Sequence, residues 1–145
     1  MNNVIIAFVI LLFSMSWLPV RAQTMTGTWR TVDDRDKQSK SYVRIYEETG
    51  LLFGKITKLL KDKPDAICEV CKGPRKNQAL LGMVVIEGLR KIRDQYGDGR
   101  IYDPVTGNDY KCTIWIEAGK PDELKVRGTH WSGIYRTQTW YKVTD

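Results

Sequence analysis

The sequence predicts an all-β fold, an antiparallel up-and-down barrel of eight strands, from two observations. Short runs of alternating apolar and polar residues recur along the chain, and a period of two is typical of a half-buried strand. In the clearest run, residues 109–117, one face carries Tyr110, Cys112, Ile114 and Ile116. Turn-forming residues separate the runs, and no convincing amphipathic helix lies between them. Closing into a barrel would bury one face and remove the exposed edges.

The first three strands are predicted at residues 26–32, 41–47 and 51–60. A charged loop at 33–40 separates the first two strands, and a tight Glu-Thr-Gly turn joins the second to the third. Gly54 is expected to mark a bulge or bend, because glycine inside a strand often does so.

Residues 61–79 form a long irregular insertion. Residues 82–89 are almost continuously apolar and β-branched, which favours a strand over a short helix. Residues 95–99 are expected to turn into a C-terminal meander. Its last strands fall at 109–117, 124–129 and 134–143.

Residues 1–22 have the layout of a signal peptide: an apolar run at 4–13, then Pro19, then Val20-Arg-Ala22 as a cleavage pattern. Residues 23–145 would then form a single β-barrel domain, periplasmic or secreted in a bacterium. Since no basic residue precedes the apolar run, a retained membrane anchor is the alternative. Gln23 stands where a lipid-modified lipoprotein would need Cys.

The formal charge of the whole chain is +6, which favours solubility and weak contact with anionic envelope surfaces. No groove-reading helix or stacking motif for nucleic acid occurs, and we expect no nucleic-acid partner.

The three cysteines allow several interpretations. In an oxidising compartment, Cys68 and Cys71 would form a local disulfide that staples the insertion. A bridge from Cys112 to either of them, a zinc site completed by His130, and a thioredoxin-like redox pair are the alternatives.

Residues for catalysis are sparse. His130 is the one imidazole, and no Gly-x-Ser-x-Gly elbow accompanies it. The aspartates Asp33, Asp34, Asp103 and Asp109 fit turn chemistry better than a catalytic pair. No glycine-rich phosphate loop occurs. The sequence therefore predicts a protein that is not an enzyme and has no cofactor and no metal.

Motifs along the mature chain carry a resemblance. They are Gly27-x-Trp29, Val43-Arg-Ile-Tyr-Glu47, Phe53-Gly-Lys-Ile56, Cys68-x-x-Cys71-Lys-Gly73, Gly82-Met83 with Gly88-Leu89, Ile101-Tyr-Asp-Pro104 with Gly107, Lys125-Val-Arg-Gly128 and Arg136-Thr-Gln-Thr-Trp140. In this order they resemble the exported bacterial family known as domain of unknown function 2147. The resemblance implies a lipocalin-like (calycin-type) barrel and no agreed activity or ligand. Lipocalins pack a cation over the Gly-x-Trp indole where the barrel closes, which here would pair Arg136 with Trp29, a contact contributing about 0.5–2 kcal/mol.

The leading functional prediction is a binding protein that holds a small apolar or amphipathic ligand inside the barrel. The candidate lining residues are Val43, Ile45, Ile56, Tyr110, Ile114, Ile116 and Val126, with Arg136 and Gln138 as polar handles. The alternative is an envelope interaction module with a filled barrel and no ligand, whose outer face or 61–79 insertion meets a partner.

Overall fold

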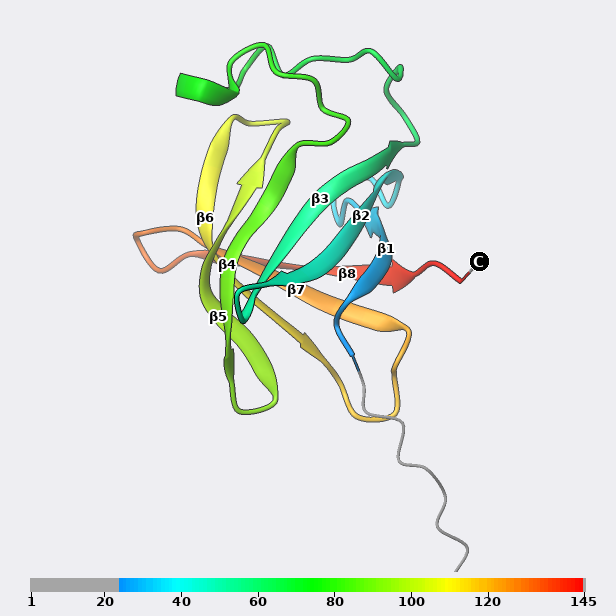
Figure 1. Cartoon of the computed structure of the whole chain (residues 1–145), viewed down its shortest axis with the longest axis vertical. Coiled ribbons are helices and arrows are strands. Elements are labelled where there is room, and N and C mark those ends of the chain that lie inside the picture. Colours follow the sequence, from blue (N-terminus) through cyan, green and yellow to red (C-terminus); the bar gives the residue numbers. More distant parts are fainter. Residues whose placement is uncertain (1–23, 145) are drawn as a thin grey trace, which may run out of the picture.

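The structure is a computed structural model that describes residues 24–144, and these form a closed barrel of antiparallel strands in chain order (Figure 1). The predicted fold class is confirmed. The strands are β1 (Gly27–Val32), β2 (Ser39–Glu48), β3 (Leu51–Leu59), β4 (Val84–Ile92), β5 (Gln95–Asp103), β6 (Asn108–Ile116), β7 (Glu123–Thr129) and β8 (Tyr135–Lys142). The predicted signal peptide, residues 1–22, lies outside the described residues. Among those described, no helix has the length and apolar character to cross a bilayer.

The start of β5 differs from the prediction, because residues 95–99 are strand rather than turn. The chain reverses just before them, where Arg93 takes a positive φ of 58°. Gly99 explains the difference: a side chain there would lie 2.4 Å from the Glu87 carbonyl oxygen of β4. The glycine therefore permits close approach of two paired strands instead of breaking one of them.

One end of the barrel, which we call the closed end, is packed solid. It carries the β2–β3, β4–β5 and β6–β7 turns, and its inward positions hold large apolar side chains. These are almost fully buried: Trp29, Ile45, Leu52, Leu89, Ile114 and Leu124. Full burial of each such side chain stabilises the fold by about 1.5–3 kcal/mol. This end therefore supplies much of the core.

The opposite end, the open end, carries the other four loops. The longest of them, residues 60–83, crosses the top of the barrel in Figure 1 and contains the short 3-10 helix η1 (Gly73–Arg75). Tyr102 anchors this segment: the Lys72 amide donates to its hydroxyl at 3.4 Å, and the Arg75 guanidinium lies 4.4 Å from its ring centre. Gly107 lies so close under the segment that a side chain there would meet the Val70 carbonyl oxygen at 2.3 Å. The segment is thus pinned to the β5–β6 turn.

The predicted disulfide between Cys68 and Cys71 is confirmed, and both residues are buried. Cys112 is a free, buried thiol between β5 and β7, opposite Gly99 and Gly128. A bridge from Cys112 to the insertion is therefore excluded. Within residues 24–144 no group of three or more His, Cys, Asp or Glu side chains is placed to hold a metal ion.

Candidate functional site

A cavity of about 560 Å³ occupies the half of the barrel next to the open end. Its volume falls in the range of small-molecule sites. The space exists because inward side chains become smaller or more polar toward the open end along three strands. From the closed end upward they read Trp29 and Thr31 on β1, with Asp33 just after it; Ile45, Val43 and Ser41 on β2; and Leu124, Val126 and Gly128 on β7.

Six of the nine predicted lining residues line this cavity: Val43, Ile56, Tyr110, Val126, Arg136 and Gln138. Ile45 and Ile114 instead belong to the packed core of the closed end, and partly buried Ile116 packs against that core. Alternation along a strand predicts the inward face correctly. It does not show how far along the barrel axis each residue lies.

The cavity wall is mainly apolar, and its buried polar groups are hydrogen-bonded. The Thr31 and Ser41 hydroxyls lie 3.0 Å apart, and Thr31 Oγ1 also accepts from the Ser41 amide at 3.1 Å. No buried side-chain nitrogen or oxygen among the described residues lacks a hydrogen-bond partner. The sequence prediction missed Thr31, Ser41 and Val85 as lining residues. Continuing the β1 and β2 alternation toward the loop would have found the first two.

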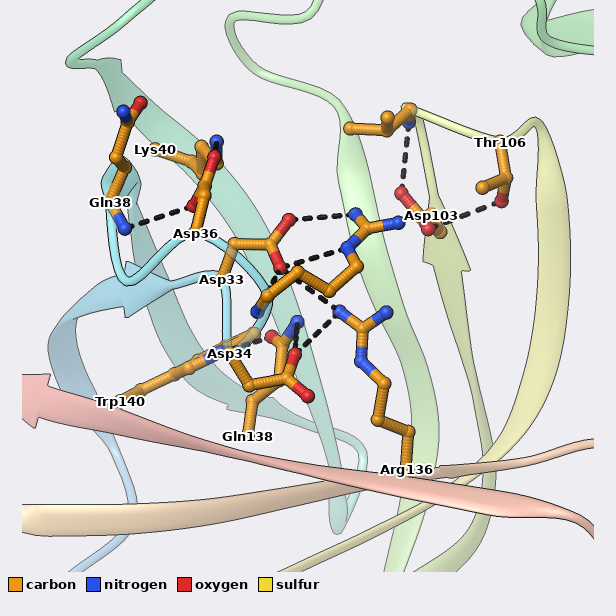
Figure 2. A network of polar contacts seen from close by, with 12 residues as sticks. Asp33, Asp34, Asp36, Gln38, Lys40, Asp103, Thr106, Arg136, Gln138 and Trp140 are labelled. Atoms are coloured by element: carbon orange, nitrogen blue, oxygen red, sulfur yellow. Dashed lines mark hydrogen bonds and ion pairs between the residues drawn. The ribbon is translucent and has the colours of Figure 1, made fainter.

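A cluster of ion pairs stands at the rim of the cavity (Figure 2). Arg35 donates to both carboxylate oxygens of Asp33, from Nε at 3.0 Å and from Nη2 at 2.7 Å. Arg136 reaches across from β8, with Nη2 at 2.7 Å from Asp34 Oδ1 and 3.4 Å from Asp33 Oδ1. The hydrogen bonds and charge of Arg35, with the charge of Arg136, hold the pKa of Asp33 well below its ordinary range.

Gln138 belongs to the same cluster. Its side-chain oxygen accepts from Trp140 Nε1 at 3.0 Å, and its amide nitrogen lies 3.5 Å from Asp34 Oδ1. Gln138 is thereby oriented along the cavity wall. Asp33 and Asp34, considered above only as turn residues, are the groups that neutralise Arg136.

The predicted contact between Arg136 and Trp29 is wrong. The β1–β8 register places Trp29 opposite Lys142, and Lys142 Nζ lies 5.5 Å from the Trp29 ring centre. Arg136 is six residues from Lys142, about 20 Å along the strand at 3.3 Å per residue. Trp29 Nε1 donates to the Met25 carbonyl at 2.8 Å, which fixes the indole at the closed end. A lipocalin-type cation–indole contact is thus present with a different cation.

His130 lies in the loop after β7 and lines the cavity mouth. Its Nδ1 is 2.8 Å from Ser132 Oγ and accepts from the Ser132 amide at 3.3 Å. These bonds hold the β7–β8 turn. Within residues 24–144 no carboxylate bonds to His130, so the pair lacks the orienting third group of a catalytic triad.

Comparison with solved structures finds protein HP1028 from the human pathogen Helicobacter pylori, described as belonging to the lipocalin family. The TM-score is 0.72 at 19% identity, with 84% of each chain covered. At that identity the likeness concerns the fold. No curated protein matches the chain. The family model described as "Uncharacterized protein conserved in bacteria (DUF2147)" matches residues 27–142, from the first strand to the last. The chain therefore belongs to the DUF2147 family, with a lipocalin-like barrel as its fold.

Proposed function

We propose that this protein is an exported binding protein that holds one small apolar or amphipathic molecule in the open half of its barrel. The single observation that carries the proposal is the mainly apolar cavity of about 560 Å³, which is lined from several strands and opens at one end. Eight-stranded barrels are just wide enough to hold one small ligand. The cavity disfavours the alternative of an interaction module with a filled barrel, and binding rather than catalysis is the proposed role.

The charges at the rim favour a ligand with a neutral polar group. Arg136 is already paired with Asp33 and Asp34, so an anionic headgroup would compete with two carboxylates for it. A hydroxyl, ester or amide group can instead exchange hydrogen bonds with Thr31, Ser41 or Gln138. An apolar tail would lie on the aliphatic wall below.

Export is part of the proposal and rests on the signal-peptide pattern of residues 1–22. The Cys68–Cys71 disulfide supports it, because such bonds persist in oxidising compartments such as the bacterial periplasm. We therefore propose a periplasmic or secreted location. The intact mass of protein isolated from an exporting cell should match a chain that begins at Gln23. A species that retains Met1 would contradict cleavage.

The test is titration of the domain from Gln23 onward with N-phenyl-1-naphthylamine, a neutral apolar fluorescent probe. Wild type should bind saturably with one site. Val126→Phe fills the cavity and should abolish binding while the far-UV circular dichroism stays unchanged. The matched control is Val70→Phe, which adds the same bulk at a residue 52% exposed and outside the cavity lining. Wild-type binding retained by Val126→Phe would place the probe elsewhere and contradict the proposal.

A further inference from the structure

The mouth of the cavity is rimmed by exposed apolar side chains, which we call the mouth patch. Trp131 is 87% exposed and Ile134 74%, both in the β7–β8 loop; Tyr135 is 60% exposed, and Val105 of the β5–β6 turn is 63% exposed. Val105, Ile134 and Tyr135 also line the cavity. The apolar surface is thus continuous from the outside of the molecule into its interior.

Trp131 packs on the neighbouring His130 ring, with ring centres 5.1 Å apart, but the hydrogen bonds that set the loop conformation lie in the backbone and between His130 and Ser132. The turn is held by backbone bonds, from the His130 amide to the Ile134 carbonyl at 2.8 Å and from the Gly133 amide to the His130 carbonyl at 2.9 Å. Gly133 supplies the positive φ of 90° that closes it. Trp131 and Ile134 therefore stand in water without contributing to the core. Clustered exposure of this kind marks an interaction surface.

The β7–β8 hairpin behind the patch is basic. Its two strands carry four cations, Lys125, Arg127, Arg136 and Lys142, against one acid, Glu123. Arg136 is neutralised by Asp33 and Asp34, and Lys125 Nζ lies 3.7 Å from Glu123 Oε2, which leaves Arg127 beside the patch and Lys142 at the closed end. The Arg127 guanidinium lies 4.3 Å from the Tyr135 ring centre, directly behind the patch. An apolar, aromatic tip on a basic stem is the pattern of segments that bind at the surface of an anionic membrane.

We infer that the mouth patch docks on a lipid bilayer containing anionic lipids, with Trp131 and Tyr135 at headgroup level and Ile134 toward the acyl chains. Tryptophan and tyrosine favour this interface because one end of each side chain is apolar and the other polar. In Figure 1 the tip projects at the left as the loop between β7 and β8. Docking would bring the cavity mouth against the lipid. The further role of passing a ligand between bilayer and cavity rests on the proposed function.

The experiment is flotation of the domain from Gln23 onward with vesicles of phosphatidylcholine alone or with about a third phosphatidylglycerol. Wild type should float with the anionic vesicles, and 0.5 M NaCl should weaken binding by screening. Trp131→Ser should weaken binding about tenfold, because it removes one large apolar anchor. Tyr141→Ser, which removes a 38% exposed aromatic near the far end of β8, should bind as wild type does. Brominated lipids should quench fluorescence in wild type more than in Trp131→Phe.

Equal flotation of wild type and Trp131→Ser would overturn the docking inference. A second outcome would also overturn it: wild type is a dimer in sedimentation velocity, Trp131→Ser is a monomer, and neither protein binds vesicles. In that case a second copy of the chain covers the patch. Since Trp131 does not line the cavity, Trp131→Ser should still bind N-phenyl-1-naphthylamine. A wild type that binds the probe but does not float with anionic vesicles is failure of this inference alone. Docking without probe binding in the wild type is failure of the proposed function.

Discussion

Arg136 Nη2 on the last strand lies 2.7 Å from Asp34 Oδ1 in the loop after the first strand, so one ion pair joins the two ends of the barrel wall at the cavity rim (Figure 2). The pair has two consequences. It ties the β1–β2 loop to β8 on the open side, where backbone pairing between β1 and β8 is confined to Trp29 and Arg30. It also removes the free positive charge that an anionic ligand would seek.

Arg136→Met should destabilise the domain by about 1–2 kcal/mol. Asp33 is only 8% exposed and would lose one of its two cations, while Arg35 continues to neutralise it. Urea unfolding at pH 7 measures the change. Arg100→Met is the control, because Arg100 pairs with Asp109 on the surface and its side chain is 67% exposed. This variant should lower the free energy of unfolding by less than about 0.5 kcal/mol. Equal losses for the two variants would show that the rim pairs are no stronger than surface pairs.

Stability should fall in acid partly through Asp33. Its pKa in the folded state lies below the unfolded value of about 3.9, because Arg35 and Arg136 favour the carboxylate. The resulting stabilisation is complete above pH 4 to 5 and is lost as the pH falls toward the depressed folded pKa. Asp33→Asn should therefore be less stable than wild type at pH 7, with the gap narrowing between pH 5 and pH 2. Parallel stability curves for the two proteins would refute the assignment.

The cysteines should give three distinct counts in thiol labelling. Burial raises the pKa of the Cys112 thiol to about 12, so it stays protonated and unreactive in the native protein at pH 8. We expect no labelled thiol in native protein, one after unfolding, and three after unfolding with a reductant. A labelled Cys112 in native protein would mean that the barrel opens beside β6.

Lys142→Met should lower the free energy of unfolding by about 0.5–1 kcal/mol through loss of the cation over the Trp29 ring. Methionine keeps most of the apolar stem, so packing against the indole is largely retained. Thermal unfolding measures the effect. Lys58→Met provides the control: Lys58 lies 5.4 Å from the ring centre of Tyr42, a residue less buried than Trp29, and should cost less. An unchanged melting temperature for Lys142→Met would show that the Lys142 cation does not stabilise the barrel through the Trp29 ring.

The sequence predicted most strands because alternation is a local property of the chain. Residues 109–117 illustrate this: Tyr110, Cys112 and Ile114 share the inward face as the pattern requires. The start of β5 was missed because a glycine in the sequence alone is compatible either with a turn or with a close contact between two strands. At Gly99 the decisive fact is the Glu87 carbonyl on the neighbouring strand, which no local pattern reveals.

The candidate site was predictable in part for the same reason. The sequence identified inward-facing residues, but their position along the barrel axis depends on the stagger between strands. Ile45 and Ile114, predicted to line the cavity, therefore lie in the packed closed end. The cation for Trp29 was misassigned because it depends on the β1–β8 register, which joins residues more than 100 positions apart. The partners of Arg136 were not predicted, because Asp33 and Asp34 follow β1 in a loop where aspartates are common turn residues.

Methyl NMR of the domain from Gln23 onward, recorded during titration with N-phenyl-1-naphthylamine, locates the bound probe within the barrel. We expect the methyl signals of Val43, Ile56 and Val126, which line the cavity, to shift together and to saturate at one equivalent of probe. The methyl signals of Leu52 and Leu89 in the packed closed end should stay in place. Shifts confined to exposed methyls such as Leu81 and Val70, with the cavity methyls unchanged, would contradict a ligand site inside the barrel.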